Sequence, residues 1–301
     1  MSFAPAKHLS SATRHLSPAT RHLLPAIKHL SSAIVLAGAL LAGVPALAQT
    51  AQEHRYCEGE DGASVAQRID ACSAVIKAGR DKGDKLAEAF NNRGVGYRLK
   101  GDHDRAIADY AQAIKLNAKF AAAFNNRGVA YDKKGEFDRA IQDYDQAIKL
   151  KPAAEAHFNR GNAYLGKSQY ASAIDDYNQA IKLKADFAGA FDNRCWARAV
   201  VGILKAALAD CNEALRLVPN NAATLDSRAF IFLKMTQFDA AVSDYDAALR
   251  IEPKLAFALY GRGLARIKNE DAAGENDIAA AKAIQADIAE EYARYGIQES
   301  R

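Results

Sequence analysis

Apolar residues recur along this chain at steps of three and four positions, within segments separated by short polar breaks. This spacing places the apolar side chains on one face of an α-helix. The helical segments come in pairs, and the pair recurs every 33–34 residues from Ala87 onward. A period of this length is typical of a solenoid, in which each unit buries its apolar face only against its neighbours. The pattern therefore predicts an all-α fold of stacked helix hairpins.

The repeat is clearest in its first three copies. They read AFNNRGVGYRLKGDHDRAIADYAQAIKLN from Ala89, AFNNRGVAYDKKGEFDRAIQDYDQAIKLK from Ala123 and AHFNRGNAYLGKSQYASAIDDYNQAIKLK from Ala156. Looser copies follow, centred on FDNRCWA, LDSRAFI and LYGRGLA. The array of units therefore covers 87–288, with the bounds 87–120, 121–153, 154–187, 188–221, 222–255 and 256–288. We interpret 49–86 as a degenerate N-terminal helical unit and 289–301 as a C-terminal capping helix and tail.

Small residues recur at the eighth and twentieth positions of the units, and aromatic residues at the fourth and twenty-fourth. This pattern closely resembles the tetratricopeptide repeat, a helix–turn–helix unit of 34 residues. The resemblance covers about 200 of the 301 residues. It implies an α-solenoid, in the form of a right-handed superhelix of antiparallel hairpins. It also implies a non-catalytic scaffold or adaptor that binds a peptide or protein in a concave groove. The C-terminal run is similar to exported tetratricopeptide proteins of α-proteobacteria.

In the family, the first helix of each unit lines the groove. Early in the array this assigns asparagines to the groove, and asparagine amides both donate and accept hydrogen bonds, so they can hold a peptide backbone. Late in the array the assigned residues are apolar, and an exposed apolar patch with a tryptophan is typical of a partner site. The alternative is that neighbouring helices or the final helix cover the late residues. The assigned residues are Asn91, Asn92, Asn125, Asn126, Asn159, Asn162, Asn193, Trp196, Phe230, Leu264 and Ile267.

The chain departs from the family at two positions of the repeat. The seventh position, usually leucine, is Arg93, Arg127, Arg160, Arg194, Arg228 and Arg262, and the twenty-third is Asp109, Asp143, Asp176, Asp210, Asp244 and Asp277. Because each arginine has its own aspartate, we interpret them as a structural ladder of planar guanidinium–carboxylate pairs. The alternative is a row of arginines that binds an acidic ligand.

The four cysteines form two pairs at nearly the same repeat positions, Cys57 with Cys72 and Cys195 with Cys211. Helix axes that lie 8–10 Å apart leave roughly 3.5–5.5 Å between facing Cα atoms, which overlaps the range of disulfides. We therefore predict two disulfides, each stabilising by about 2–4 kcal/mol in an oxidising compartment. The alternative is buried free thiols. The cysteine spacing does not fit a zinc site.

The first 48 residues differ from the rest of the chain. A basic leader without acidic residues precedes an apolar run over 33–44, and Ala46-Leu47-Ala48 follows. The run fits a secretory signal and is too short to span a bilayer. We predict a signal peptide over 1–48, cleavage between Ala48 and Gln49, and a periplasmic or secreted protein. The alternatives are an organelle transit peptide and, from histidines recurring every seven residues, a metal-binding array in the leader.

Charge and motifs narrow the function further. Four of the 40 basic residues precede Gln49, so the other 36 balance the 36 acidic residues. Neutrality argues against nucleic acid as a partner, and the chain has no motif for a catalytic nucleophile, a phosphate loop or a metal. We expect no enzyme activity, no cofactor, no small-molecule substrate and no stable membrane anchor. The expected partner is a protein or peptide; the alternatives are self-association into a structural assembly, or a cytoplasmic or organellar adaptor.

Overall fold

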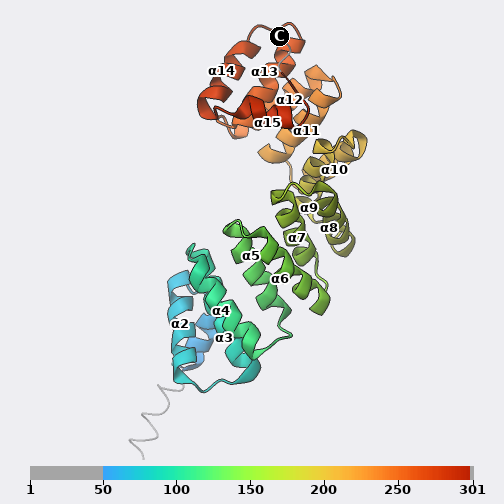
Figure 1. Ribbon diagram of the computed structural model, residues 1–301. Helices are drawn as coiled ribbons and strands as arrows, with labels where there is room; N and C mark the ends of the chain where they lie inside the picture. Colours follow the sequence, from blue (N-terminus) through green and yellow to red (C-terminus); the bar gives the residue numbers. More distant parts are fainter. Residues whose placement is uncertain (1–49, 299–301) are drawn as a thin grey trace, which may run out of the picture. The chain divides into compact units, whose positions relative to one another are not determined.

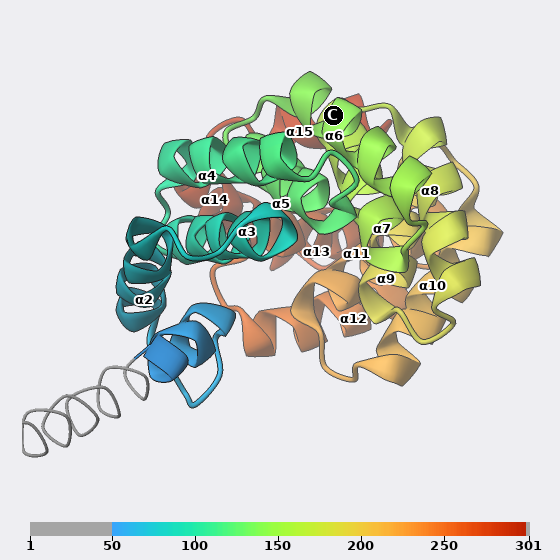
Figure 2. The same cartoon turned by 90° about the horizontal axis from the view of Figure 1, so that it is seen from below.

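The computed structural model describes residues 50–298 (Figures 1 and 2). The predicted signal peptide, its cleavage site after Ala48 and the end of the tail lie outside the described residues. The chain divides into two units, Met1–Ala51 and Gln52–Arg301, and all helices from α2 onward belong to the second.

The described residues are helical, with no strand among them. Residues 50–58 form a helix that precedes α2. The other helices are α2 (Val65–Ala78), α3 (Gly83–Leu99), α4 (His103–Leu116), α5 (Ala121–Lys133), α6 (Phe137–Leu150), α7 (Ala154–Gly166), α8 (Tyr170–Leu183), α9 (Ala188–Val200), α10 (Leu204–Leu217), α11 (Ala222–Lys234), α12 (Phe238–Ile251), α13 (Ala256–Lys268), α14 (Gly274–Ile284) and α15 (Ile288–Arg294).

The helices from α3 to α14 form consecutive hairpins, α3 with α4 through α13 with α14. Each second helix also packs against the first helix of the next hairpin, and the first helices of neighbouring hairpins contact one another. The colours in Figure 1 follow this order from one hairpin to the next. The fold is thus an all-α solenoid, as the period of the sequence predicts. One boundary differs, because α3 begins at Gly83, before the unit start predicted at Ala87.

A glycine and a tyrosine set the distance between the two helices of the early hairpins. The rings of Tyr110, Tyr144 and Tyr177 are almost fully buried. Each ring lies so close to the glycine of the partner helix that a Cβ there would stand 2.7 Å from a ring carbon. An alanine at these positions would push the helices apart, which explains the glycines Gly94, Gly128 and Gly161.

The turns inside the hairpins share a residue in the left-handed region. It is glycine in three of them, at Gly101, Gly135 and Gly202, with φ between 74° and 84°. Ser168, Thr236 and Glu270 occupy the equivalent place in the other turns, with φ between 56° and 60°. A residue with a side chain is strained there. Glycine therefore ends the first helix in only half of the hairpins.

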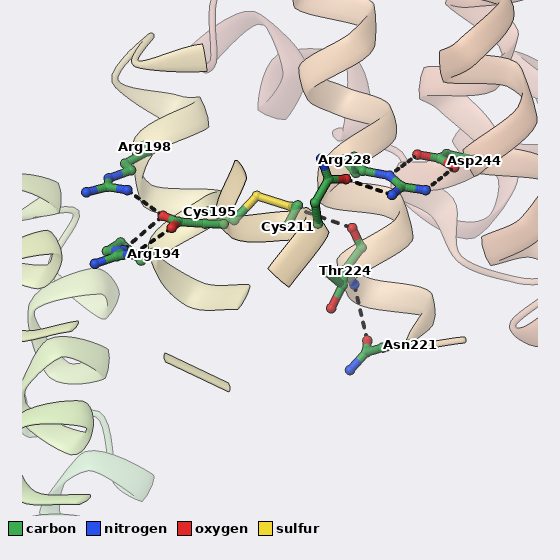
Figure 3. Close-up of a disulfide and its surroundings, with 10 residues drawn as sticks. Arg194, Cys195, Arg198, Cys211, Asn221, Thr224, Arg228 and Asp244 are labelled. Atoms are coloured by element: carbon green, nitrogen blue, oxygen red, sulfur yellow. Dashed lines mark hydrogen bonds and ion pairs between the residues drawn. A yellow bond between two sulfur atoms is a disulfide. The ribbon is translucent and has the colours of Figure 1, made fainter. Parts of the chain in front are cut away.

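Both cysteine pairs are joined as disulfides. The Cα atoms of Cys57 and Cys72 lie 4.6 Å apart, and those of Cys195 and Cys211 lie 5.4 Å apart. The second disulfide connects α9 to α10 across a hairpin (Figure 3). All four cysteines are buried, and the alternative of free thiols does not apply.

Candidate protein-binding surface

The arginine–aspartate ladder links the two helices of every hairpin. In all six pairs the guanidinium donates from Nε and Nη2 to the two carboxylate oxygens, over 2.6–2.9 Å. The aspartate side chains are only 4–11% exposed. The hydrogen bond to the aspartate raises the pKa of Arg93 and of Arg127, so both remain charged. Two parallel bonds to a buried carboxylate hold each arginine in place.

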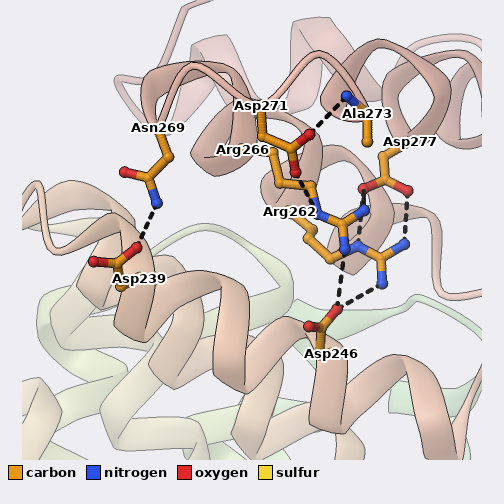
Figure 4. A network of polar contacts seen from close by, with 8 residues as sticks. All are labelled: Asp239, Asp246, Arg262, Arg266, Asn269, Asp271, Ala273 and Asp277. Carbon is orange, nitrogen blue, oxygen red and sulfur yellow. Dashed lines mark hydrogen bonds and ion pairs between the residues drawn. The ribbon is translucent and has the colours of Figure 1, made fainter.

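The remaining donor of the arginine connects one unit to the unit before it. Arg160 Nη1 donates to Asp145 on α6, over 2.5 Å, and Arg194 Nη1 donates to Asn178 on α8, over 2.7 Å. Arg262 likewise bridges Asp277 of its own hairpin and Asp246 of the preceding one (Figure 4). These contacts assign the ladder a structural role between helices, and where both are present they leave little of the guanidinium for an acidic ligand.

The asparagines assigned to the groove also form contacts from unit to unit. Asn126 Nδ2 donates to Asn91 Oδ1 over 2.9 Å, and Asn159 Nδ2 donates to Asn125 Oδ1 over 3.1 Å. Asn193 and the Tyr177 hydroxyl both donate to Asn162 Oδ1. Asn91 is buried, while the other six are half-buried. An amide has two donor hydrogens and two acceptor lone pairs, so these bonds orient the side chains and leave further capacity. We call the part of the first helices that carries these seven asparagines the asparagine surface.

A cavity of about 230 Å³ lies beside this surface, between α5, α6 and α7. Alanines form most of its wall, and three polar side chains accompany them. The lining residues are Ala121, Ala122, Asn125, Ala147, Lys151, Ala153, Glu155 and Ala156. The small side chains create the space, because no large residue from these helices fills it.

The late residues assigned to the groove do not form an exposed apolar patch, which corrects that prediction. Phe230 is fully buried and Leu264 is 7% exposed, while Trp196 and Ile267 are half-buried within the same cluster. The cover is α15 with Tyr295, the residue directly after it, whose ring centre lies 5.1 Å from that of Trp196. The alternative, a final helix that folds over this end of the array, is what the structure contains.

Two buried carboxyl groups near this cluster have no role in the sequence-based prediction. One oxygen each of Asp192 and Asp226 is buried without a hydrogen-bond partner among the described residues. Burial raises the pKa of both carboxyl groups, and that of Asp226 rises well above its usual value. Both residues occupy the fifth repeat position, which is asparagine in the first two units. The sequence could not reveal their burial, because it depends on what covers them.

The described residues 50–298 contain neither a metal-binding cluster nor a helix that could span a membrane. No group of three or more histidine, cysteine, aspartate or glutamate side chains there is arranged to hold a metal ion. Within the same range, every helix is too short or too polar to cross a lipid bilayer. His157, which replaces an aromatic residue of the repeat, contacts the ladder aspartate Asp176 at 2.9 Å.

Comparison with protein families identifies the repeat. Residues 121–153 and 154–187 each match the tetratricopeptide repeat, and residues 94–135 match a related model of the same repeat. The bounds of the first two matches coincide with those of the second and third units. A search of the curated proteins found no match.

Solved structures with a similar fold include YrrB, described as a tetratricopeptide repeat protein with an unusual peptide-binding site. It is 19% identical, the match covers 65% of this chain and 100% of YrrB, and the TM-score is 0.55. A tetratricopeptide repeat protein from Parabacteroides merdae is 18% identical, with 82% of this chain and 99% of that chain covered and a TM-score of 0.60. PilW, a type IV pilus biogenesis factor, is 20% identical, with 69% and 94% covered and a TM-score of 0.58.

Tetratricopeptide repeats generally serve as scaffolds for interactions between proteins and do not catalyse reactions. The matched units, the stacked hairpins and the shared fold agree with one another. On these grounds the chain is a tetratricopeptide repeat protein.

Proposed function

We propose that this scaffold binds a peptide segment of a partner protein along the asparagine surface, in the groove that the repeat family uses. The half-buried asparagines of α3, α5, α7 and α9 carry the proposal, because their bonds to one another fix the direction of the amides. A fixed row of amides can pair with the backbone of an extended peptide without requiring a particular sequence. The cavity of about 230 Å³ beside Asn125 has room for a side chain of that peptide.

The protein acts outside the cytoplasm in this proposal. The N-terminal 48 residues supply the export signal, and two buried disulfides fit an oxidising compartment such as the periplasm. We expect the mature chain to begin at Gln49 and to have no thiol that reacts with an alkylating reagent before reduction. N-terminal sequencing and thiol trapping on protein from a cell-envelope fraction test both points. A chain that retains residues 1–48 and reacts with the reagent would argue for the cytoplasmic adaptor.

Filling the cavity tests the binding site. Ala122 is exposed on α5 and lines the cavity, so Ala122→Arg places a long side chain in the space for the peptide. We expect the purified chain to capture a protein from an envelope extract and Ala122→Arg to lose it. Gln112→Arg is the matched control, because Gln112 is exposed on α4 and is absent from the cavity wall. Loss of the captured protein in both variants, or in neither, contradicts the proposed site. If the extract yields only further copies of this chain, the result indicates self-assembly.

A further inference from the structure

The last helix, α15, inserts one tyrosine deep into the array. Tyr292 is fully buried, and its ring stacks on Phe257 of α13 with the ring centres 4.2 Å apart. Its hydroxyl donates to the Phe257 carbonyl oxygen over 2.8 Å and lies 3.3 Å from the Tyr245 hydroxyl. Buried tyrosines usually find a partner for the hydroxyl, and this one has two. The array therefore binds both the ring and the hydroxyl of Tyr292.

A second tyrosine of the same segment reaches the earlier units. The ring of Tyr295 lies edge-on to Trp196 of α9, and its backbone carbonyl accepts a hydrogen bond from Lys234 of α11 over 3.1 Å. Lys234 also donates to the carbonyl of Ala199. The segment Ile288–Tyr295 thus contacts first helices of three units, with two aromatic rings and one backbone carbonyl as its main contacts. These are the contacts that a bound peptide makes.

The residues under α15 occupy the same repeat positions as the asparagine surface. Trp196, Phe230 and Leu264 stand at the ninth position, where Asn162 stands in the third unit. Phe257 and Tyr260 stand at the second and fifth positions of their unit. The chain's own segment therefore lies on the continuation of the surface that we propose for the partner. Figure 1 shows α15, in red, beside α13 and α14, with which it is in contact.

The carboxyl group of Asp226, near α15, lies in surroundings of unfavourable charge. Asp226 of α11 is 9% exposed, and its Oδ1 has no hydrogen-bond partner among the described residues. The charged groups that act on it are Glu252, Glu291 of α15 and Asp192, in that order, and all are acidic. The tyrosines Tyr245 and Tyr292 also face this region. Charge complementarity at this point favours a cation, whereas α15 presents a carboxylate.

We propose that α15 is a displaceable occupant of this surface, and that the partner segment replacing it carries two aromatic side chains and a basic residue that pairs with Asp226. The aromatic side chains would take the places of Tyr292 and Tyr295, and the basic residue would stand where Glu291 stands. This inference rests on the proposed function and specifies the chemistry of the partner. A ligand of this kind satisfies the buried carboxyl that the chain's own helix leaves unpaired.

Synthetic peptides of residues 286–298 test the inference on the full-length chain. The host is Tyr295→Ala, which removes the contact with Trp196 and leaves Tyr292 in place; circular dichroism checks its fold. Fluorescence anisotropy compares a labelled peptide carrying Glu291→Arg with one carrying Glu290→Arg, because Glu290 is exposed and the net charge is the same. We expect the Glu291→Arg peptide to bind about ten-fold more tightly, as a charge-assisted contact with Asp226 predicts. Asp226→Asn in the host should abolish this preference.

Equal binding of the two peptides, or a preference that survives Asp226→Asn, overturns the pairing with Asp226. Absence of binding at millimolar peptide overturns the displaceable occupant. Hydrogen exchange on the unaltered chain supplies an independent measurement: the amides of α15 should exchange while those of α13 remain protected. Equal protection of the two helices would make α15 a permanent cap. If Ala122→Arg abolishes capture of the partner but the peptides do not affect it, this inference is wrong and the proposed function remains supported.

Discussion

Four ladder arginines connect two pairs of helices at once, one pair inside their own hairpin and one between that hairpin and the hairpin before it. The contact to the earlier hairpin requires an acceptor at the twenty-fifth repeat position. Asp145, Asn178, Asn212 and Asp246 provide it to Arg160, Arg194, Arg228 and Arg262, respectively. The first unit has Ala111 at this position, so the structure gives Arg127 the pair with Asp143 and no such contact. One junction is therefore weaker by one hydrogen bond.

Ala111→Asn should supply the missing acceptor. Hydrogen bonds to charged groups contribute about 1.5–3 kcal/mol, and the lower helix propensity of asparagine costs about 0.5 kcal/mol. Because position 111 is only half-buried, water weakens the new hydrogen bond. We therefore expect a gain of about 1 kcal/mol in the free energy of unfolding, measured by urea denaturation. Asn178→Ala, the reverse change at the equivalent position, should lose a similar amount. A gain that persists after Arg127→Met would show that the new side chain acts elsewhere.

Asp226 gives the stability of the protein a dependence on pH. Burial, with Glu252 and Glu291, raises the pKa of this carboxyl in the folded state well above the value of about 3.9 in an unfolded chain. Between these two values the folded state binds more protons than the unfolded state, so stability falls as the pH rises through this range.

Asp226→Asn keeps the shape of the protonated carboxyl and cannot ionise. We expect it to raise the free energy of unfolding near pH 7 by on the order of 1–3 kcal/mol, the cost of an unsatisfied buried group, and to have little effect near pH 4. Thermal unfolding at several pH values measures the difference. The exposed Asp175→Asn is the control and should show none. A gain of equal size at pH 4 and pH 7 would contradict ionisation of Asp226 as the cause.

At the scale of the element, the turns between paired helices differ in strain. Thr236 holds φ at 59°, although its β-branched side chain disfavours the left-handed region. Gly135 holds a similar φ of 74° without this cost. The two turns connect equivalent helices, so they form a natural comparison.

Thr236→Gly should therefore stabilise the protein. Relief of the left-handed strain contributes about 1–2 kcal/mol, and the greater freedom of glycine in the unfolded chain offsets about 0.4–1 kcal/mol. We expect a net gain of about 0.5–1 kcal/mol in urea denaturation, and a net loss of about the same size for Gly135→Thr, because the same two terms act in reverse. No change in either variant would mean that the turns relax when the residue changes.

The elements that repeat could be predicted from the sequence together with their packing, whereas the final helix could be predicted without its contacts. Gly128 and Tyr144 recur with the period, so their packing follows from the family pattern, and the same register pairs Arg127 with Asp143. The packing of α15 on the array has no periodic counterpart. It depends on contacts such as that of Tyr295 with Trp196. Trp196 stands at the ninth repeat position, but Tyr295 lies beyond the last unit, so no period relates the two residues. The burial of Asp226 could not be predicted either, because the fifth repeat position is half-buried at Asn125 and buried at Asn91.

At the scale of the whole molecule, apolar packing is uneven. One large cluster of buried residues extends from Cys195 on α9 to Tyr292 on α15, whereas the clusters of the earlier units are small and rich in alanine. In a solenoid each unit is stabilised by its own packing and by its neighbours, so stability can vary along the array. The C-terminal hairpins should therefore be the most resistant to unfolding.

Trp196, the only tryptophan, lies in this cluster and reports on it alone. In urea we expect helicity, followed by far-ultraviolet circular dichroism, to begin to fall before the fluorescence of Trp196 changes. Reduction of the Cys195–Cys211 disulfide should bring the two transitions closer, because that crosslink lies at the edge of the cluster. Coincident transitions in the oxidised protein would show that the array unfolds as one cooperative unit.

The bonds that join neighbouring hairpins run in the same sense at successive junctions, from an arginine or asparagine to the hairpin before it. Except in the first unit, which has Ala111, the second helix of one hairpin therefore presents an acceptor to the arginine of the next hairpin. A gene segment encoding 121–153 could be duplicated in frame, and the extra hairpin would meet complementary donors and acceptors on both sides. Such an array can gain whole hairpins without any change to its core. Recombination alone can therefore change the length of the surface that faces a partner.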